Sequence, residues 1–184
     1  YFAVTGQKRM QVFEDFGEGY SAEHSYYIED SNLTNDKIRA EIICREKTAG
    51  IRLDPAEEPC LVRVEAVTYC GRRLTGEQLG QVVVTNGTVL EDGEDAAART
   101  GMPTVLFEDA DPNINIRLDA LDRLDQTGQP DSAGREGGGK TDVVTGAMSG
   151  GMLVIEARIA RLSAQMLADI RAKMTTGRKR HWFR

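Results

Sequence analysis

The chain has 184 residues, of which 40% are hydrophobic and 28% charged, and its formal net charge at pH 7 is −6. This length allows one domain with a sizeable core and is short for two. The acidic balance argues against the broad basic face that nucleic-acid binding requires, and no apolar run approaches the ~20 residues of a membrane span. We therefore expect a soluble globular protein that binds no nucleic acid and does not span a membrane. The location that we expect is the cytoplasm, where a partner can hold the protein at the inner face of the membrane.

Most of the chain alternates apolar and polar side chains, which is the pattern of strands with one buried face. Turn signals rich in Gly, Asn, Asp and Pro separate these segments at spacings near ten residues. The Rossmann-like alternative needs helices between the strands, and no such helices are indicated. The pattern predicts an all-β fold, an antiparallel β-sandwich or jelly roll, over residues 1–162. Its clearest strand segments are residues 10–15, 38–46, 60–69, 81–91, 103–109 and 113–121.

Two of the turn signals are specific enough to predict a backbone conformation. Gly17 and Gly19, in the stretch FGEGY, are typical of positions with positive φ. Asn86-Gly87, between QVVVT and TVLE, is the dipeptide that favours a tight two-residue hairpin.

The end of the chain changes character. Residues 152–162 alternate like a strand, but their apolar positions also fit the stripe of a helix that starts near Gly151, and both alternatives stay open. From residue 163 we expect one C-terminal helix and a basic tail, to residue 184, with Ser163 as N-cap and Gly177 as terminator. Its stripe of Met166, Ile170 and Met174 suggests a contact with a neighbouring domain or a homo-oligomer.

A glycine-rich segment, residues 128–150, looks like a flexible insertion and contains GREGGGKT, residues 134–141. These eight residues match the phosphate-binding pattern G-x-x-x-x-G-K-[ST]. That pattern works only between a buried strand and a helix. The polar residues before it and the three glycines soon after it fit neither, so a nucleotide site here is a remote alternative.

Three phrases resemble a known module. They are QVFEDFGEGYSAEHSYYIED (residues 11–30), AGIRLDPAEEPCLVRVEAVTYCGR (49–72) and TVLFEDADPNINIRLDAL (104–121). They resemble the accessory β-sandwich found beside catalytic domains in many bacterial glycosyltransferases and polysaccharide-biosynthesis proteins. The resemblance covers most of residues 10–162 and departs in the glycine-rich loop. It implies a galactose-binding-like jelly roll that has no active site of its own.

Within the phrase IRLDP, Pro55 ends a strand, because proline cannot donate to a sheet ladder. Arg52 and Asp54 then share one face of that strand, where they can pair with each other. We interpret these three residues as a structural motif at a sheet corner.

Sugar binding requires exposed aromatic rings that cover the apolar faces of pyranose units. The candidates are Tyr20, Tyr26, Tyr27 and Tyr69, with Glu18, His24 and Arg72 or Arg73 as polar neighbours. Since Tyr26 and Tyr27 are adjacent, a strand turns one of them away from the core. The other interpretation is tyrosine packed in the core or at its rim.

Calcium is the other ligand that the sequence allows. Asp109, Asp111 and Asn113 alternate in DADPN like the start of a calcium loop. An EF-hand is excluded, because Ile114 stands where that loop needs Gly and Ala120 where it needs Glu. An irregular calcium site is the remaining possibility, and no other metal or cofactor is expected.

Enzyme chemistry finds little support. Cys44, Cys60 and Cys70 form no C-x-x-C pair, and we expect them to be reduced and buried. His24 and His181, the two histidines, lack metal-ligand spacing. We predict no catalysis by this chain. If the chain comes from an enzyme, the catalytic domain lies elsewhere in that protein.

The leading function is a carbohydrate-associated accessory module that contacts a glycan or a neighbouring glycosyltransferase domain. The alternative is an interaction sandwich without glycan affinity.

Overall fold

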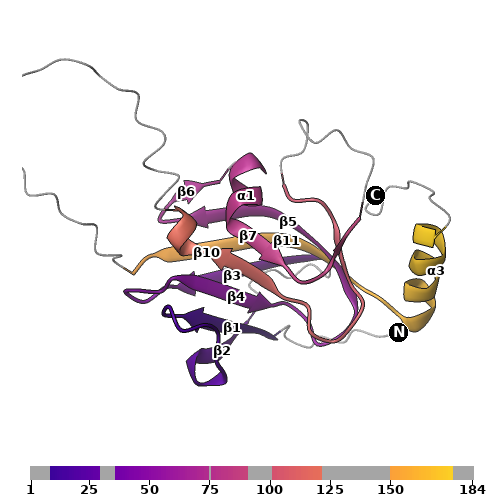
Figure 1. Ribbon diagram of the computed structural model, residues 1–184, viewed down its shortest axis with the longest axis horizontal. Helices are drawn as coiled ribbons and strands as arrows, with labels where there is room; N and C mark the ends of the chain where they lie inside the picture. Colours follow the sequence, from indigo (N-terminus) through magenta and orange to yellow (C-terminus); the bar gives the residue numbers. More distant parts are fainter. Residues whose placement is uncertain (1–8, 30–35, 75, 91–100, 122–149, 176–184) are drawn as a thin grey trace, which may run out of the picture.

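The computed structural model describes residues 9–29, 36–74, 76–90, 101–121 and 150–175. Its strands form two antiparallel sheets, and a helix follows the last strand (Figure 1). The all-β class with a C-terminal helix, predicted from the sequence, is confirmed. The GREGGGKT stretch, the basic tail and all of the glycine-rich segment except Gly150 lie outside the described residues. None of the described helices is long and apolar enough to cross a membrane.

The first sheet, called here the β4 sheet, has the order β2-β1-β4-β10-β7. All its neighbouring strands are antiparallel. The strands are β1 (Arg9–Asp15), β2 (Ser25–Glu29), β4 (Gly50–Asp54), β7 (Val83–Thr85) and β10 (Ile114–Arg117), and a short 3-10 turn, η1 (Ala22–His24), precedes β2.

The second sheet, called the β5 sheet, has the order β3-β11-β5-β9-β8, with β6 paired to β5. Its strands are β3 (Lys37–Ile43), β5 (Cys60–Tyr69), β6 (Arg72–Arg73), β8 (Thr88–Val89), β9 (Val105–Phe107) and β11 (Met152–Arg161). The two long strands β5 and β11 pair along nearly their whole length.

One hydrophobic core lies between the two sheets. Because side chains alternate along a strand, each sheet turns every second residue inward. Ile51 and Leu53 of β4 and Leu153 and Ile155 of β11 are all fully buried in the same cluster. Each such side chain contributes about 1.5–3 kcal/mol by leaving water, so the two inner faces hold the sheets together.

The structure resolves the alternative left open for residues 152–162 in favour of a strand. β11 alternates strictly, with Leu153, Ile155, Ala157 and Ile159 inside. It forms ladders with both β3 and β5, and the ladder with β5 shifts register between Glu156 and Ala157. A strand between two partners has its backbone N–H and C=O groups hydrogen-bonded on both sides. A helix at this position would leave the facing edges of β3 and β5 without hydrogen-bond partners.

Two helical segments were not predicted. Helix α1 (Gly76–Val82) occupies residues expected to form a turn and the start of a strand, and it buries Leu79 and Val82. The predicted strand 113–121 is correct only for Ile114–Arg117, because residues 118–121 are helical. Leu118 and Leu121 are buried three positions apart, which is a helical spacing and not the period of a strand.

The predicted hairpin at Asn86-Gly87 is wrong. β7 and β8, on either side of it, belong to different sheets, so the chain crosses here from one sheet to the other. The Asn86 side chain accepts a hydrogen bond from Asn113 N–H (3.1 Å) and donates one to the Asp111 carbonyl (2.9 Å). A Cβ at Gly87 would lie 2.6 Å from the Leu106 carbonyl oxygen, so this glycine is required by close packing.

The C-terminal helix α3 (Ala164–Thr175) covers part of the outer side of the β5 sheet. Ser163 caps it, because its Oγ accepts a hydrogen bond from Met166 N–H at 3.2 Å. Leu167 and Ile170 pack into a second apolar cluster with Leu61, Leu90, Leu106 and Leu162. The apolar side of the helix therefore binds the chain's own sheet, while Met166 and Met174 stay 48% and 40% exposed.

The cysteine prediction is correct in part. All three cysteines are free thiols, and Cys44 and Cys60 are buried as expected. Cys70 is exposed, which contradicts the prediction, because it sits in the tight turn after β5 with a φ of 48°.

Candidate functional site

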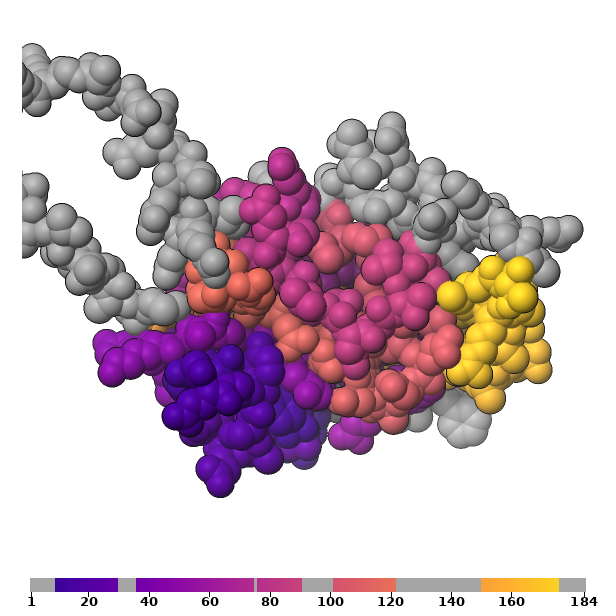
Figure 2. Space-filling view, in the orientation of Figure 1, coloured from indigo at the N-terminus to yellow at the C-terminus, as the bar shows by residue number. Residues whose placement is uncertain are grey.

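The outer side of the β4 sheet carries aromatic and hydrogen-bonding side chains, among them four residues named in the sequence analysis, Tyr20, Tyr27, Arg52 and Asp54. Alternation along the strands turns these side chains away from the core. This surface, called here the β4 face, includes Gln11, Phe13, Asp15, Tyr20, Tyr27, Arg52, Asp54 and Asn115. In the space-filling view, β1 and β2 (indigo) lie at the end of the molecule opposite α3 (yellow) (Figure 2).

Three aromatic residues follow a diagonal across the β4 face. Tyr27 of β2 pairs with Gln11 of β1, and Phe13 lies two positions further along β1. Tyr20 comes next, because its hydroxyl lies over Gly50, the partner of Asp15. Tyr20 is 37% exposed and Tyr27 51% exposed, and the Arg9 guanidinium lies 4.8 Å from the centroid of the Tyr27 ring.

The turn after β1 returns Tyr20 to the sheet. The Asp15 carboxylate accepts hydrogen bonds from the backbone N–H groups of Gly17 (2.7 Å) and Gly19 (2.8 Å). Both glycines have positive φ, at 101° and 93°, as their sequence context predicted. A Cβ at residue 50 would lie only 2.8 Å from the Tyr20 hydroxyl, so glycine makes room for the ring. Burial, and then the nearby Asp15 carboxylate, raise the pKa of Tyr20 to about 12.

Arg52 is the fixed polar group of the β4 face. Its Nε and Nη2 donate to the two carboxylate oxygens of Asp54 at 2.7 and 2.8 Å, as their spacing predicted. Nη2 also donates to Asp111 at 2.6 Å, and the guanidinium lies 4.9 Å from the centroid of the Phe13 ring. The hydrogen bond to Asp54 raises the pKa of Arg52, while burial raises the pKa of Asp54. Pro55 directly follows the strand.

Only two of the four candidate tyrosines lie on this face. Tyr26 points toward the core, where its hydroxyl donates to Glu14 Oε1 at 3.4 Å. Tyr69 packs against the core from β5, in the other sheet. The sequence analysis did not predict Phe13 as a site residue, although in RMQVFED it falls on the same face of the strand as Gln11 and Asp15. Its role depends on which strands lie beside β1, and no local pattern reveals that.

The calcium candidates form hydrogen bonds within the protein. Asp111 N–H donates to Asp109 Oδ1 at 3.3 Å, and the Asp111 carboxylate is bound by Arg52. Across the described part of the chain, no three His, Cys, Asp or Glu side chains are placed to hold a metal ion. The calcium site therefore stays a sequence-based prediction.

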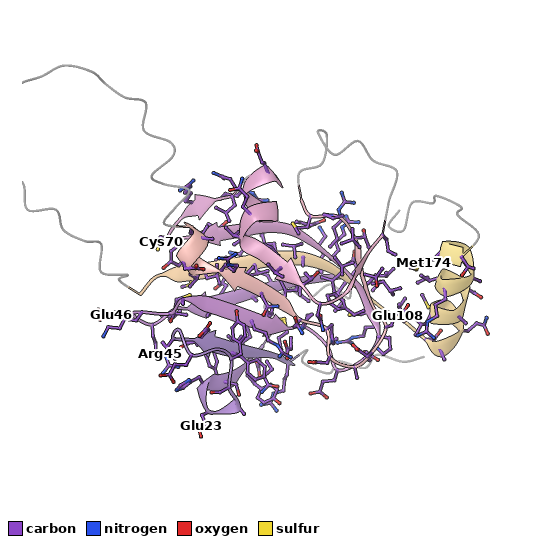
Figure 3. All side chains as sticks on the ribbon, in the orientation of Figure 1. Glu23, Arg45, Glu46, Cys70, Glu108 and Met174 are labelled. Carbon is purple, nitrogen blue, oxygen red and sulfur yellow. The ribbon has the colours of Figure 1, made fainter. Side chains whose placement is uncertain are left out.

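A separate cavity of about 580 Å³ lies beside the edge strands β2 and β3. Glu14, Tyr26, His24 and Arg45 contribute to its lining. Glu14 is 1% exposed, and its Oε2 accepts a hydrogen bond from Arg45 Nε at 2.5 Å. The Arg45 guanidinium also lies 4.8 Å from the Phe16 ring centroid. The carboxylate is thus neutralised within the chain. Figure 3 shows Arg45 and Glu23 at the end of the molecule remote from α3.

The chain matches no protein-family model, no curated protein and no solved structure.

Proposed function

We propose that this chain is a non-catalytic, glycan-binding β-sandwich module of the jelly-roll type. In this proposal it serves a bacterial glycosyltransferase or a polysaccharide-assembly protein, as the resemblance of its strand phrases implies. The observation that carries the proposal is the diagonal of Tyr27, Phe13 and Tyr20 on the β4 face, next to the fixed guanidinium of Arg52.

The chemistry of this surface suits a sugar chain. Pyranose rings have apolar C–H faces that pack on aromatic rings, and their hydroxyl groups need donors and acceptors at the same time. Tyr27 and Tyr20 offer rings, while Gln11 and Asn115 carry amide groups with both donor and acceptor atoms. Hydrogen bonds within the protein orient these amides, from Gln11 to Ser25 and from Asn115 to Asn113. Because Asp54 and Asp111 hold Arg52 in place, its remaining donors are already oriented, which lowers the entropy cost of binding.

The charge of the β4 face favours a neutral glycan. Arg52 binds Asp54 and Asp111, and together with Asp15 these three carboxylates outnumber the two cations Arg52 and Arg9 beside the aromatic diagonal. An acidic sugar placed there would meet like charges, which cost binding energy.

A non-catalytic role agrees with the carboxylates in the structure. Glu14 is the one charged side chain among the described residues that are buried, and Arg45 binds it. A general acid or base needs a proton that it can exchange with a substrate. A carboxylate that is only 1% exposed and bound by a guanidinium is poorly suited to that task.

Affinity gel electrophoresis against neutral and acidic polysaccharides tests the proposal, followed by titration calorimetry with oligosaccharides of the best polymer. We expect Tyr27→Ala to weaken binding about tenfold, or about 1.4 kcal/mol, because one stacking ring is removed. Ile43→Ala is the matched control, since Ile43 is 73% exposed and belongs to the other sheet.

Binding of a neutral glycan that Tyr27→Ala weakens and Ile43→Ala does not would support the proposal. Absence of binding to every polymer, with a folded protein, would favour the interaction sandwich. Equal loss in both variants would contradict the assignment to the β4 face.

A further inference from the structure

The outer side of the β5 sheet has the opposite electrostatic character. In the ladders, Arg158 of β11 stands directly opposite Lys37 of β3 on one side and Arg63 of β5 on the other. Neighbouring strands lie about 4.8 Å apart, so three cations form one row across three strands. Like charges directly opposite each other destabilise a sheet. Glu65 of β5 compensates part of this charge, because Arg158 Nε lies 2.9 Å from Glu65 Oε1.

Two more cations lie beside the row. Glu156 of β11 accepts hydrogen bonds from Arg39 Nη1 at 2.7 Å and from Arg73 Nη1 at 2.9 Å, one on each carboxylate oxygen. Glu156 thus holds guanidinium groups from β3 and β6 on either side of β11. Arg39 Nε also donates to Glu41 Oε1 at 2.9 Å, so this arginine bridges two carboxylates with the five N–H donors of its guanidinium.

A depression of about 360 Å³ lies between these groups, lined by Lys37, Arg39 and Arg73 together with Glu65 and Glu156. Counting the cationic row as well, this surface, called the cationic face, carries the cations Lys37, Arg39, Arg63, Arg73 and Arg158 and the carboxylates Glu41, Glu65 and Glu156. Five cations against three carboxylates leave a local excess of positive charge in a chain whose net charge is −6.

We propose that the cationic face binds an acidic glycan, through carboxylates on its sugar units. Arginine forks bind carboxylates with two parallel hydrogen bonds, and the depression offers arginine donors from two strands. No aromatic side chain points outward from β3, β11 or β5, so the stacking platform that single-stranded nucleic acids use is missing from these strands. The glycan nature of the ligand rests on the proposed function, whereas the requirement for carboxylates rests on the arginines alone.

The probe is a hexamer of galacturonic acid, titrated by calorimetry at low and at physiological salt. We expect binding that weakens severalfold as salt rises, because an ionic contact is screened. Lys37→Gln with Arg63→Gln should weaken binding at least tenfold. Arg9→Gln with Arg117→Gln, which removes the same charge from the β4 sheet, should keep the affinity. Circular dichroism and thermal unfolding check that both double variants are folded.

Equal affinity of the two double variants, or no binding at low salt, would overturn the inference. Tighter binding of a polyglutamate peptide or of phosphatidylserine vesicles than of the hexamer would overturn the assignment to a glycan. Tyr27→Ala separates the two proposals. It should leave binding of the acidic hexamer intact, so failure of the β4 face and failure of the cationic face are seen independently.

Discussion

Arg45 Nε lies 2.5 Å from Glu14 Oε2 and joins two elements that are distant in the sequence. Glu14 continues the inward-facing series of Met10 and Val12 on β1, and it is only 1% exposed. Arg45 follows β3, in the other sheet, and its side chain is 58% exposed. The pair therefore links the β4 sheet to the chain that leaves β3.

Arg45→Ala should lower the free energy of unfolding by about 2 kcal/mol, because a buried carboxylate loses its charge-assisted hydrogen bond. Urea unfolding measures this loss. Arg117→Ala is the control, since the Arg117–Asp119 pair is exposed, and a change within about 0.5 kcal/mol is expected there. Adding Glu14→Gln to Arg45→Ala should recover part of the stability. Equal losses for Arg45→Ala and Arg117→Ala would show that Glu14 does not depend on Arg45.

Tyr26 should make the protein sensitive to alkaline pH. Burial, with the nearby Glu14 carboxylate, raises the pKa of Tyr26 from 10.0 to about 12. Because the unfolded chain loses this proton first, the contribution to stability is complete below pH 10 and is lost as pH rises toward 12. The melting temperature of the wild type should fall more steeply over this window than that of Tyr26→Phe. Parallel slopes would contradict a role of Tyr26. The wild type must be compared with Tyr26→Phe because Tyr20, Cys44 and Cys60 also have pKa values raised to about 12.

The sequence predicted those parts of the fold that depend on local alternation. Met10, Val12 and Leu153 are buried where a period of two places them. Alternation gave a wrong prediction near Leu118, where the chain becomes helical after a short strand instead of continuing as a strand. The hairpin at Asn86 failed for another reason. A two-residue loop between two strands does not require that they pair, and the Asn86 side chain binds the segment before β10 instead.

In the candidate site, too, contacts between residues close in the sequence were predictable, and contacts between distant residues were not. Arg52 reaches Asp54 two positions away, and that pair was predictable from the side-chain period. Arg52 also reaches Asp111, which is 59 positions away, and no pattern in the sequence indicates this contact. The neighbours of Phe13 depend likewise on β1 lying between β2 and β4, which only the sheet order determines.

The three cysteines should react at very different rates. Burial raises the pKa of Cys44 and Cys60 to about 12, and both side chains are almost completely shielded from solvent. Thiolates are the reactive form, so these two thiols should resist a maleimide in the native protein. Cys70 is exposed and should be labelled. Mass spectrometry should therefore find one label under native conditions and three in denaturant. Cys70→Ser should abolish the native label, and a label that remains would contradict the burial of the other two.

Two glycines should respond in opposite directions to the same substitution. Gly80 lies in α1, and a Cβ there would have no atom within 4 Å, so Gly80→Ala should stabilise the protein by about 0.5–1 kcal/mol through helix propensity. A Cβ at Gly101 would lie 2.5 Å from the Val64 carbonyl oxygen and 3.0 Å from Glu65 Cα, both in the backbone of β5. Because backbone atoms yield little, Gly101→Ala should destabilise by about 1–3 kcal/mol. Urea unfolding of both variants measures the difference. A Gly101→Ala variant as stable as the wild type would show that residue 101 does not pack against β5.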